Sequence, residues 1–196
     1  MTGLSLIVVH DAGESNFILP VLNDVLRSDS GKRTVRVLAL GQPAISLFEE
    51  FNEVLVTPAS LDLETKVIDG DNGREQKLTA RDMEKVLQAF PPDQVEMVIT
   101  GMVYMMESQI ALVYRETNVG KRVVGIFDCF GLWNDDSLCA RDFTDQTLPS
   151  ISEIWLCAKQ QVVPEFYKWG IKPVVTGSPT LSVWLKEALG DTVSHT

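Results

Sequence analysis

Short apolar runs alternate along this chain with longer segments whose apolar residues recur every three or four positions. The runs are rich in Val, Ile and Leu, which is typical of strands covered on both faces of a parallel sheet. We therefore predict a three-layer α/β domain, with helices on both faces of a mostly parallel sheet of about seven strands and the first strand away from the sheet edge. The strands are expected at residues 4–9, 34–40, 53–57, 95–100, 122–128, 153–158 and 173–176, and the helices at 16–28, 43–51, 79–89, 104–117, 160–169 and 180–189.

Two stretches interrupt this alternation. Residues 58–78 contain a turn-rich polar insert around Gly70 and Gly73, and residues 129–150 form a long irregular loop. Long loops in compact domains are usually functional or mobile. Since no linker or repeat divides the chain, residues 1–196 are interpreted as one domain.

The loop after the first strand is the strongest candidate site, because open α/β sheets bind ligands at the carboxyl ends of their strands. Ser15 or Asn16 is expected to cap a helix that begins at residue 16, which would place Pro20 in its first turn. His10 is the candidate general base. The alternative is a capped helix start in which His10 has a structural role. The candidate residues of this loop are His10, Asp11, Gly13, Glu14, Ser15 and Asn16, with Gly13 allowing a tight turn and Asp11 orienting His10.

Three other strand ends carry further candidates. Asp128 ends the fifth strand and is a second group that could orient His10, and Trp133 and Asn134 follow it in the long loop. An aromatic ring and an amide suit a sugar or a base, although an ordinary turn with the Trp133 ring folded back explains them equally well. The last strand runs into Gly177 and Ser178, and the fourth into Gly101, where each glycine is alternatively a simple connection.

Composition and charge exclude several classes of function. The net charge is −10 and the basic residues are scattered, so neither nucleic acid nor an anionic membrane is an expected partner. No apolar run reaches the roughly 20 residues of a membrane span, and no secretory signal precedes the first strand, which favours the cytoplasm. With two histidines and with cysteines at Cys129, Cys139 and Cys157, neither a metal site nor a cofactor is expected.

Several short motifs resemble those of a known family. The Ala-Gly-Glu-Ser segment that begins at Ala12, the position of Pro20 and the segment 175–179 are similar to the N-terminal Rossmann-like half of GT-B glycosyltransferases and sugar-nucleotide 2-epimerases. The resemblance implies that a sugar, a nucleotide-sugar or a glycosylated acceptor binds at the carboxyl strand ends, with the nucleotide-sugar as substrate. Enzymes of the GT-B family use a second Rossmann domain, so glycosyl transfer to a hydroxyl would require a partner domain.

A second hypothesis is a Rossmann-like ligand sensor or assembly subunit without turnover, because one domain rarely closes a cleft well enough to exclude water. Self-association or a separate partner chain is expected in either case. The predicted C-terminal helix carries Trp184 and Leu185, which are hard to bury together on one narrow helical stripe.

Overall fold

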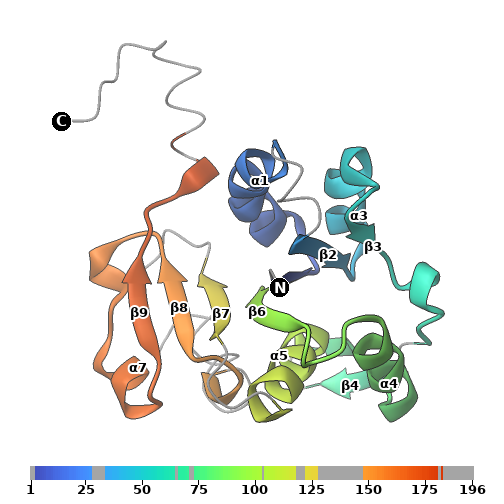
Figure 1. The fold of residues 1–196 in the computed structure, drawn as a ribbon. Coiled ribbons are helices and arrows are strands. Elements are labelled where there is room, and N and C mark those ends of the chain that lie inside the picture. Colours follow the sequence, from blue (N-terminus) through green and yellow to red (C-terminus); the bar gives the residue numbers. More distant parts are fainter. Residues whose placement is uncertain are drawn as a thin grey trace.

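The fold is built around one seven-stranded sheet, as predicted (Figure 1). The computed structural model describes residues 3–27, 34–64, 66–70, 73–102, 104–117, 122–127, 148–180 and 182. The strand order is β3-β2-β1-β6-β7-β8-β9, and every neighbouring pair is parallel. The strands are β1 (Leu4–Val9), β2 (Val35–Ala39), β3 (Leu55–Val56), β6 (Val95–Thr100), β7 (Arg122–Phe127), β8 (Glu153–Leu156) and β9 (Lys172–Val175).

The first strand lies inside the sheet, between β2 and β6. Successive strands are added on one side of β1 as far as β3, after which the chain crosses back and adds β6 to β9 on the other side. This reversal between β1 and β6 is the topological switch point of the fold. In open α/β sheets the crevice at such a point is where ligands bind.

Helices cover both faces of the sheet, which confirms the three layers. Alternate residues of β1 point to opposite faces: Ile7 and Val9 pack with α1 and α3, whereas Leu6 and Val8 belong to the core formed with α4, α5 and α7. Figure 1 shows α1 and α3 on one side of the sheet and α4 and α5 on the other. The helices are α1 (Ala12–Leu26), α3 (Gln42–Phe48), α4 (Ala80–Ala89), α5 (Met105–Thr117) and α7 (Pro164–Lys168).

The first helix begins four residues earlier than predicted, at Ala12. The reason is that Asp11, and neither Ser15 nor Asn16, is the N-cap: its side chain accepts a hydrogen bond from the amide of Glu14. Pro20 consequently lies in the helix interior rather than in the first turn. A proline has no N–H to give to the carbonyl four residues earlier, and here the hydroxyl of Thr180 donates to that carbonyl, on Asn16, at 2.5 Å.

The polar insert at residues 58–78 contains a β-hairpin that the sequence interpretation missed. Strands β4 (Lys66–Gly70) and β5 (Gly73–Lys77) pair antiparallel and form a small sheet of their own. Two residues separate the strands, and glycine stands on either side of them. The sequence of β5 is almost entirely polar, so it lacks the alternation of apolar and polar residues by which a strand is usually recognised.

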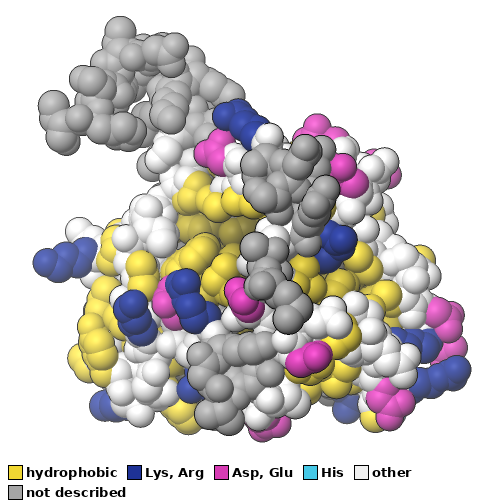
Figure 2. Space-filling model, in the orientation of Figure 1, with side chains coloured by type: hydrophobic (Ala, Val, Ile, Leu, Met, Phe, Trp, Pro, Cys, Tyr) yellow, Lys and Arg dark blue, Asp and Glu magenta, His cyan; other side chains and the backbone are white. Residues whose placement is uncertain are grey.

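Helix length and the distribution of charged side chains bear on which partners the protein could bind. No helix in the described ranges is long and apolar enough to cross a bilayer. On the face shown in Figure 2, Lys and Arg side chains are dispersed among acidic and apolar ones.

Candidate functional site

The switch point brings together three strand ends and two glycines that make room for polar side chains. A Cβ atom at Gly41, just after β2, would lie 2.2 Å from the carbonyl oxygen of His10. A Cβ atom at Gly101, just after β6, would lie 2.1 Å from the carboxyl carbon of Glu14. Because glycine has no Cβ atom, the loop after β1 can pack closely against the backbone after β2 and the backbone after β6.

His10 directly follows β1, and its ring stacks on the ring of Tyr104. The ring centroids are 3.8 Å apart and the planes are inclined by 24°. Tyr104 remains 36% exposed and His10 is half-buried, so the stack faces solvent on one side. Burial lowers the pKa of His10, although the nearby Asp11 carboxylate opposes this shift. The imidazole is therefore neutral at pH 7 and able to accept a proton.

Two buried carboxyl groups lie behind the stack. Glu14, in the first turn of α1, is 1% exposed, and Glu107, in the first turn of α5, is fully buried. Oε2 of Glu14 accepts from the amide of His10 at 3.2 Å, and Oε2 of Glu107 accepts from the amide of Tyr104 at 3.1 Å. Each carboxyl thus holds the backbone of one residue of the aromatic stack.

Oε1 of Glu14 and Oε1 of Glu107 are both buried, and the two carboxyls lie close enough for a hydrogen bond, which would require that one of them carries a proton. Burial, followed by the negative charge of Glu14, raises the pKa of Glu107 well above its ordinary value. The carboxyl of Glu107 therefore retains its proton to a higher pH than an exposed glutamate does.

Two other predicted site residues build the start of α1. Oδ1 of Asp11 accepts from the amide of Glu14 at 3.1 Å, and Oγ of buried Ser15 donates to the carbonyl of Asp11 at 2.5 Å. Gly13 lies within the first helical turn, so the predicted tight turn at this residue is wrong. Ala12 and Gly13 are exposed, and their amides precede the first hydrogen-bonded turn of the helix.

The segment after the last strand reaches the same helix. Gly177 has φ +73°, a backbone conformation that favours glycine, and Ser178 accepts from the amide of Ser182 at 3.1 Å. The hydrogen bond from Thr180 to Asn16 then ties this segment to α1. Among the predicted candidates Asp128, Trp133 and Asn134 lie outside the described residues.

Sequence reasoning missed Tyr104, Glu107 and Gly41. An acidic residue in the first turn of a helix usually interacts with the helix dipole at the surface, so Glu107 carried no sign of burial. A weak signal did exist, because Tyr104 and Glu107 follow the fourth predicted strand and its Gly101, and carboxyl strand ends of a parallel sheet share one edge.

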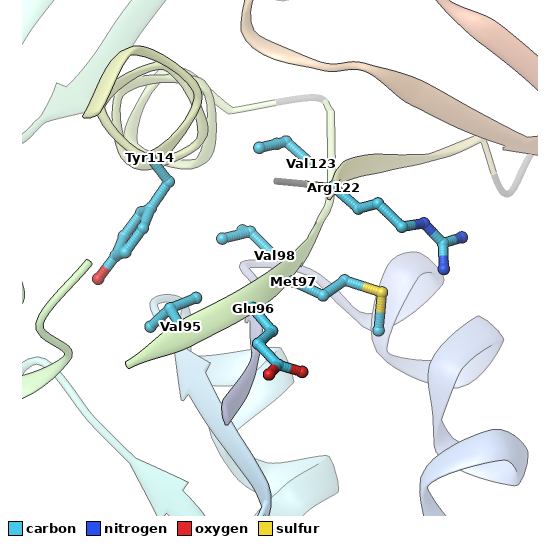
Figure 3. Close-up of a pocket in the computed structure, with 7 residues that line it drawn as sticks. All are labelled: Val95, Glu96, Met97, Val98, Tyr114, Arg122 and Val123. Carbon is cyan, nitrogen blue, oxygen red and sulfur yellow. The ribbon is translucent and has the colours of Figure 1, made fainter. Parts of the chain in front are cut away.

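A hollow at the opposite edge of the sheet does not belong to this site (Figure 3). It measures about 140 Å³ with open solvent included, and it encloses no room for a water molecule. Its walls come from the starts of β6 and β7 together with Tyr114, as Figure 3 shows. We assign it no role in binding. Within the described ranges no three His, Cys, Asp or Glu side chains are grouped to hold a metal ion.

Solved structures with this fold include UDP-N-acetylglucosamine 2-epimerases. A protein of that description from Listeria monocytogenes superposes with a TM-score of 0.55 at 12% identity, over 100% of this chain and 50% of its own. A second UDP-N-acetylglucosamine 2-epimerase gives a TM-score of 0.54 at 11% identity, over 98% of this chain and 53% of its own. A co-structure of S. aureus MnaA with UDP gives 0.56 at 10% identity, over 99% and 50%.

These similarities concern the fold. The chain spans about half the length of the solved structures it matches, which corresponds to one Rossmann-like half. The expected likeness to such a half is thereby confirmed. No protein-family model and no curated protein matches the sequence.

Proposed function

We propose that this chain is the sugar-binding half of a glycosyltransferase-like or epimerase-like protein, and that it holds a hydroxyl-rich ligand at the switch point between β1 and β6. The observation that carries the proposal is the convergence of the His10–Tyr104 stack with the buried pair Glu14 and Glu107 at this point of the sheet. A sugar ring presents an apolar face to an aromatic ring and hydroxyls to the groups around it.

The charges around the stack favour hydroxyls over phosphates. The start of α1 offers a partial positive charge, but an interaction at a helix end is worth only about 0.3–1 kcal/mol at an exposed site. The carboxylate of Asp11 lies at the same helix end, and like charges about 4 Å apart repel by roughly 4 kcal/mol at the effective dielectric constant of a protein surface. Repulsion exceeds attraction, so the phosphates of a nucleotide-sugar would be held by a partner domain.

A catalytic role for His10 is consistent with its environment. The neutral imidazole lies at the carboxyl end of β1 and can accept the proton of a ligand hydroxyl. Glu14 acts on it only through the backbone, because the amide of His10 donates to that carboxyl. Glycosyl transfer to a hydroxyl would then require the donor to be presented by the partner domain.

Ligand binding without turnover is the second candidate function. Glu14 and Glu107 are both buried, and Asp11 is engaged as a helix cap, so no described acidic side chain of the cluster is free to act on a ligand together with His10. A release assay for UDP from UDP-sugars, run beside the binding measurement, separates the two functions. Binding with no release in the presence of a hydroxyl acceptor favours a sensor.

Calorimetry with three ligands tests the proposed site. UDP-N-acetylglucosamine, UDP and free N-acetylglucosamine would be titrated into the protein, and the first and third are expected to bind more tightly than UDP. UDP is an apt probe because one fold neighbour is a co-structure with it. Absence of binding for all three would contradict the proposal, and tighter binding of UDP than of either sugar ligand would reverse the assignment of hydroxyls over phosphates.

Matched variants locate the binding. Tyr104→Ala removes the partner of His10, whereas Tyr167→Ala removes an aromatic ring that is 64% exposed on α7, before the start of β9. We expect sugar affinity to fall about two- to tenfold in the first variant, since an aromatic contact is worth roughly 0.5–1.5 kcal/mol. Equal losses in both variants would place the ligand elsewhere.

A further inference from the structure

We propose that His10 acts in the candidate site as a hydrogen-bond donor, with its neutral imidazole carrying the proton on Nε2 and offering it to an uncharged acceptor oxygen of the ligand. The part that concerns the ligand rests on the proposed function. The position of the proton does not, because it is a property of the free protein.

Three contacts hold the imidazole in one orientation. One face of the ring stacks on Tyr104 at a centroid distance of 3.8 Å. The edge that contains Nδ1 and Cε1 faces the backbone just after β2, where a Cβ atom at Gly41 would lie 2.8 Å from both ring atoms. The amide of His10 donates to Glu14 at 3.2 Å and holds the backbone from which the ring projects. Nδ1 and Nε2 therefore have fixed and different surroundings.

The two ring nitrogens differ in their access to solvent. Nδ1 is buried, and it has no hydrogen-bond partner within the part of the chain that the structure describes. Nε2 is not buried in this way, and His10 as a whole is half-buried, so Nε2 is the nitrogen that a ligand can reach. A neutral imidazole has one N–H and one bare nitrogen, and its surroundings decide which nitrogen carries the proton.

These surroundings favour the proton on Nε2. Among backbone groups, buried N–H groups without an acceptor are rarer than buried acceptors without a donor, and the same loss of hydration applies to a side chain. A proton on Nδ1 would also add an atom to the ring edge that already faces Gly41. On Nε2 the N–H can donate to solvent until a ligand oxygen takes its place.

A general base would need the opposite arrangement. A histidine that takes a proton through Nε2 carries its own proton on Nδ1, where a carboxylate or a carbonyl usually accepts it. Asp11 was the expected partner, but its Oδ1 accepts from the amide of Glu14, and it makes no hydrogen bond with Nδ1 of His10. The position of the proton therefore favours ligand binding without turnover over glycosyl transfer.

The ligand group that fits an N–H donor at this point is an uncharged oxygen. A sugar hydroxyl or the carbonyl of an acetamido group can accept from Nε2 of His10 while the sugar ring lies against Tyr104. A carboxylate or a phosphate would bring a negative charge towards Asp11, whose carboxylate acts on the imidazole. Burial lowers the pKa of His10, which agrees with a ring whose second proton would have to enter at the buried Nδ1.

Nitrogen-15 NMR of the ligand-free protein tests the position of the proton. The sequence has two histidines, so in His195→Gln all imidazole signals come from His10. Correlation with the carbon-bound ring protons identifies each nitrogen, and its chemical shift shows whether it is protonated. Above the pH at which His10 titrates we expect the proton on Nε2, and in urea, as the control, the averaged shifts of free histidine. A proton on Nδ1, or averaged shifts in the folded protein, would overturn the inference.

Two variants test the donor by calorimetry. His10→Gln keeps an N–H at about the reach of Nε2 but cannot act as a base, and His10→Met has a similar reach without a donor. We expect N-acetylglucosamine to bind about two- to tenfold more tightly to the first variant, which is the worth of one hydrogen bond. Glucose distinguishes the two oxygens: the same ratio assigns a hydroxyl as the acceptor, and a ratio of one assigns the acetamido carbonyl. Equal affinities of the variants for both sugars would contradict the donor role, and so would release of UDP that His10→Gln abolishes.

The inference and the proposed function fail in different ways. If no sugar ligand binds and the proton is on Nε2, the proposed function is wrong and the assignment of the proton stands. If the sugars bind and the proton is on Nδ1, the inference is wrong, and His10 is then arranged as a general base.

Discussion

Two glutamates are buried at opposite ends of the strands, and their surroundings shift their pKa values in opposite directions. The end of the sheet at which the strands begin is called the amino edge, and the end at which they finish is called the carboxyl edge. At the amino edge, Glu153 at the start of β8 accepts from Arg122 at 2.6 Å and from the indole N–H of Trp155 at 2.7 Å. Burial alone would raise the pKa of Glu153, but these hydrogen bonds and the charge of Arg122 outweigh burial and lower it. At the carboxyl edge, Glu107 has another carboxyl as its neighbour, and its pKa is raised.

The difference indicates that the contacts of the buried glutamate at the amino edge serve stability alone. A glutamate that meets a cation and an N–H donor is satisfied without a proton, and such a contact is structural. A pair of carboxyls is satisfied only with a proton, and strongly perturbed pKa values of this kind gather at functional sites. The contrast supports the carboxyl edge as the place of action, in agreement with the topology of the sheet.

The largest expected effect comes from closing the space that the carboxyl pair occupies. In Gly101→Ala the new methyl group would lie 2.1 Å from the carboxyl carbon of Glu14, which is a buried group, so one of the two must shift. We expect a loss of about 3 kcal/mol in the free energy of unfolding, measured by urea titration. Gly177→Ala is the control: nothing lies within 4 Å, and its φ of +73° predicts a cost of only about 1–2 kcal/mol. A tolerated Gly101→Ala would show that the pair is not confined.

The pH dependence of stability should have opposite signs at the two edges. The pKa of Glu107 is raised in the folded state, so its contribution to stability is complete below the ordinary glutamate pKa and is lost as the pH rises through the raised value. In that window one proton changes the free energy of unfolding by about 1.4 kcal/mol per pH unit. Glu107→Gln should remove this slope. A wild-type slope identical to that of the variant would contradict the protonated pair.

Glu153 should give the reverse result at a smaller magnitude. Its pKa is lowered in the folded state, so its contribution is present above the ordinary glutamate pKa and is lost as the pH falls through the lowered value. Arg122 is largely exposed, which weakens the ion pair, so we expect Glu153→Gln to cost about 1 kcal/mol at pH 7 and almost nothing in acid. Thermal unfolding at several pH values measures both variants. A cost that grows in acid would be inconsistent with the contacts of Glu153.

The smallest effect concerns the backbone carbonyl of Asn16, near the carboxyl edge. This carbonyl accepts its hydrogen bond from Thr180, which is far away in the sequence. Thr180→Val removes its hydroxyl donor and should cost about 0.5 kcal/mol at this exposed position. In a Pro20→Ala background the helix regains an N–H for the same carbonyl, so the valine substitution should then cost nothing. A double-mutant cycle with no coupling would show that Thr180 does not compensate for the proline.

Much of the architecture could be predicted because it rests on local patterns. The strands at Leu4–Val9 and Val95–Thr100 agree with the predicted ranges to the residue, since short runs of mainly apolar residues define them. The start of α1 was misplaced because Asp11 was interpreted as a partner of His10 rather than as a cap. The hairpin of β4 and β5 escaped prediction because its second strand is polar.

The candidate site was only half predictable, for a physical reason. His10, Glu14 and Gly101 stand out because glycine and polar residues directly follow apolar strands. The stack on Tyr104 and the pairing with Glu107 depend on how the starts of α1 and α5 approach each other across the sheet. Contacts between helices that are far apart in the sequence leave no periodicity in either one.

The position of β1 in the sheet also determines the order in which the protein can assemble during synthesis. Ser5 pairs with Val35 on one side, thirty residues away, and with Met97 on the other side, ninety-two residues away. The part of the sheet that contains β2 and β3 can therefore form on a nascent chain well before β6 has left the ribosome. Until then, Glu14 cannot contact Glu107 and His10 cannot stack on Tyr104. The candidate site therefore lies where a part of the chain that is synthesised early meets a part that is synthesised late.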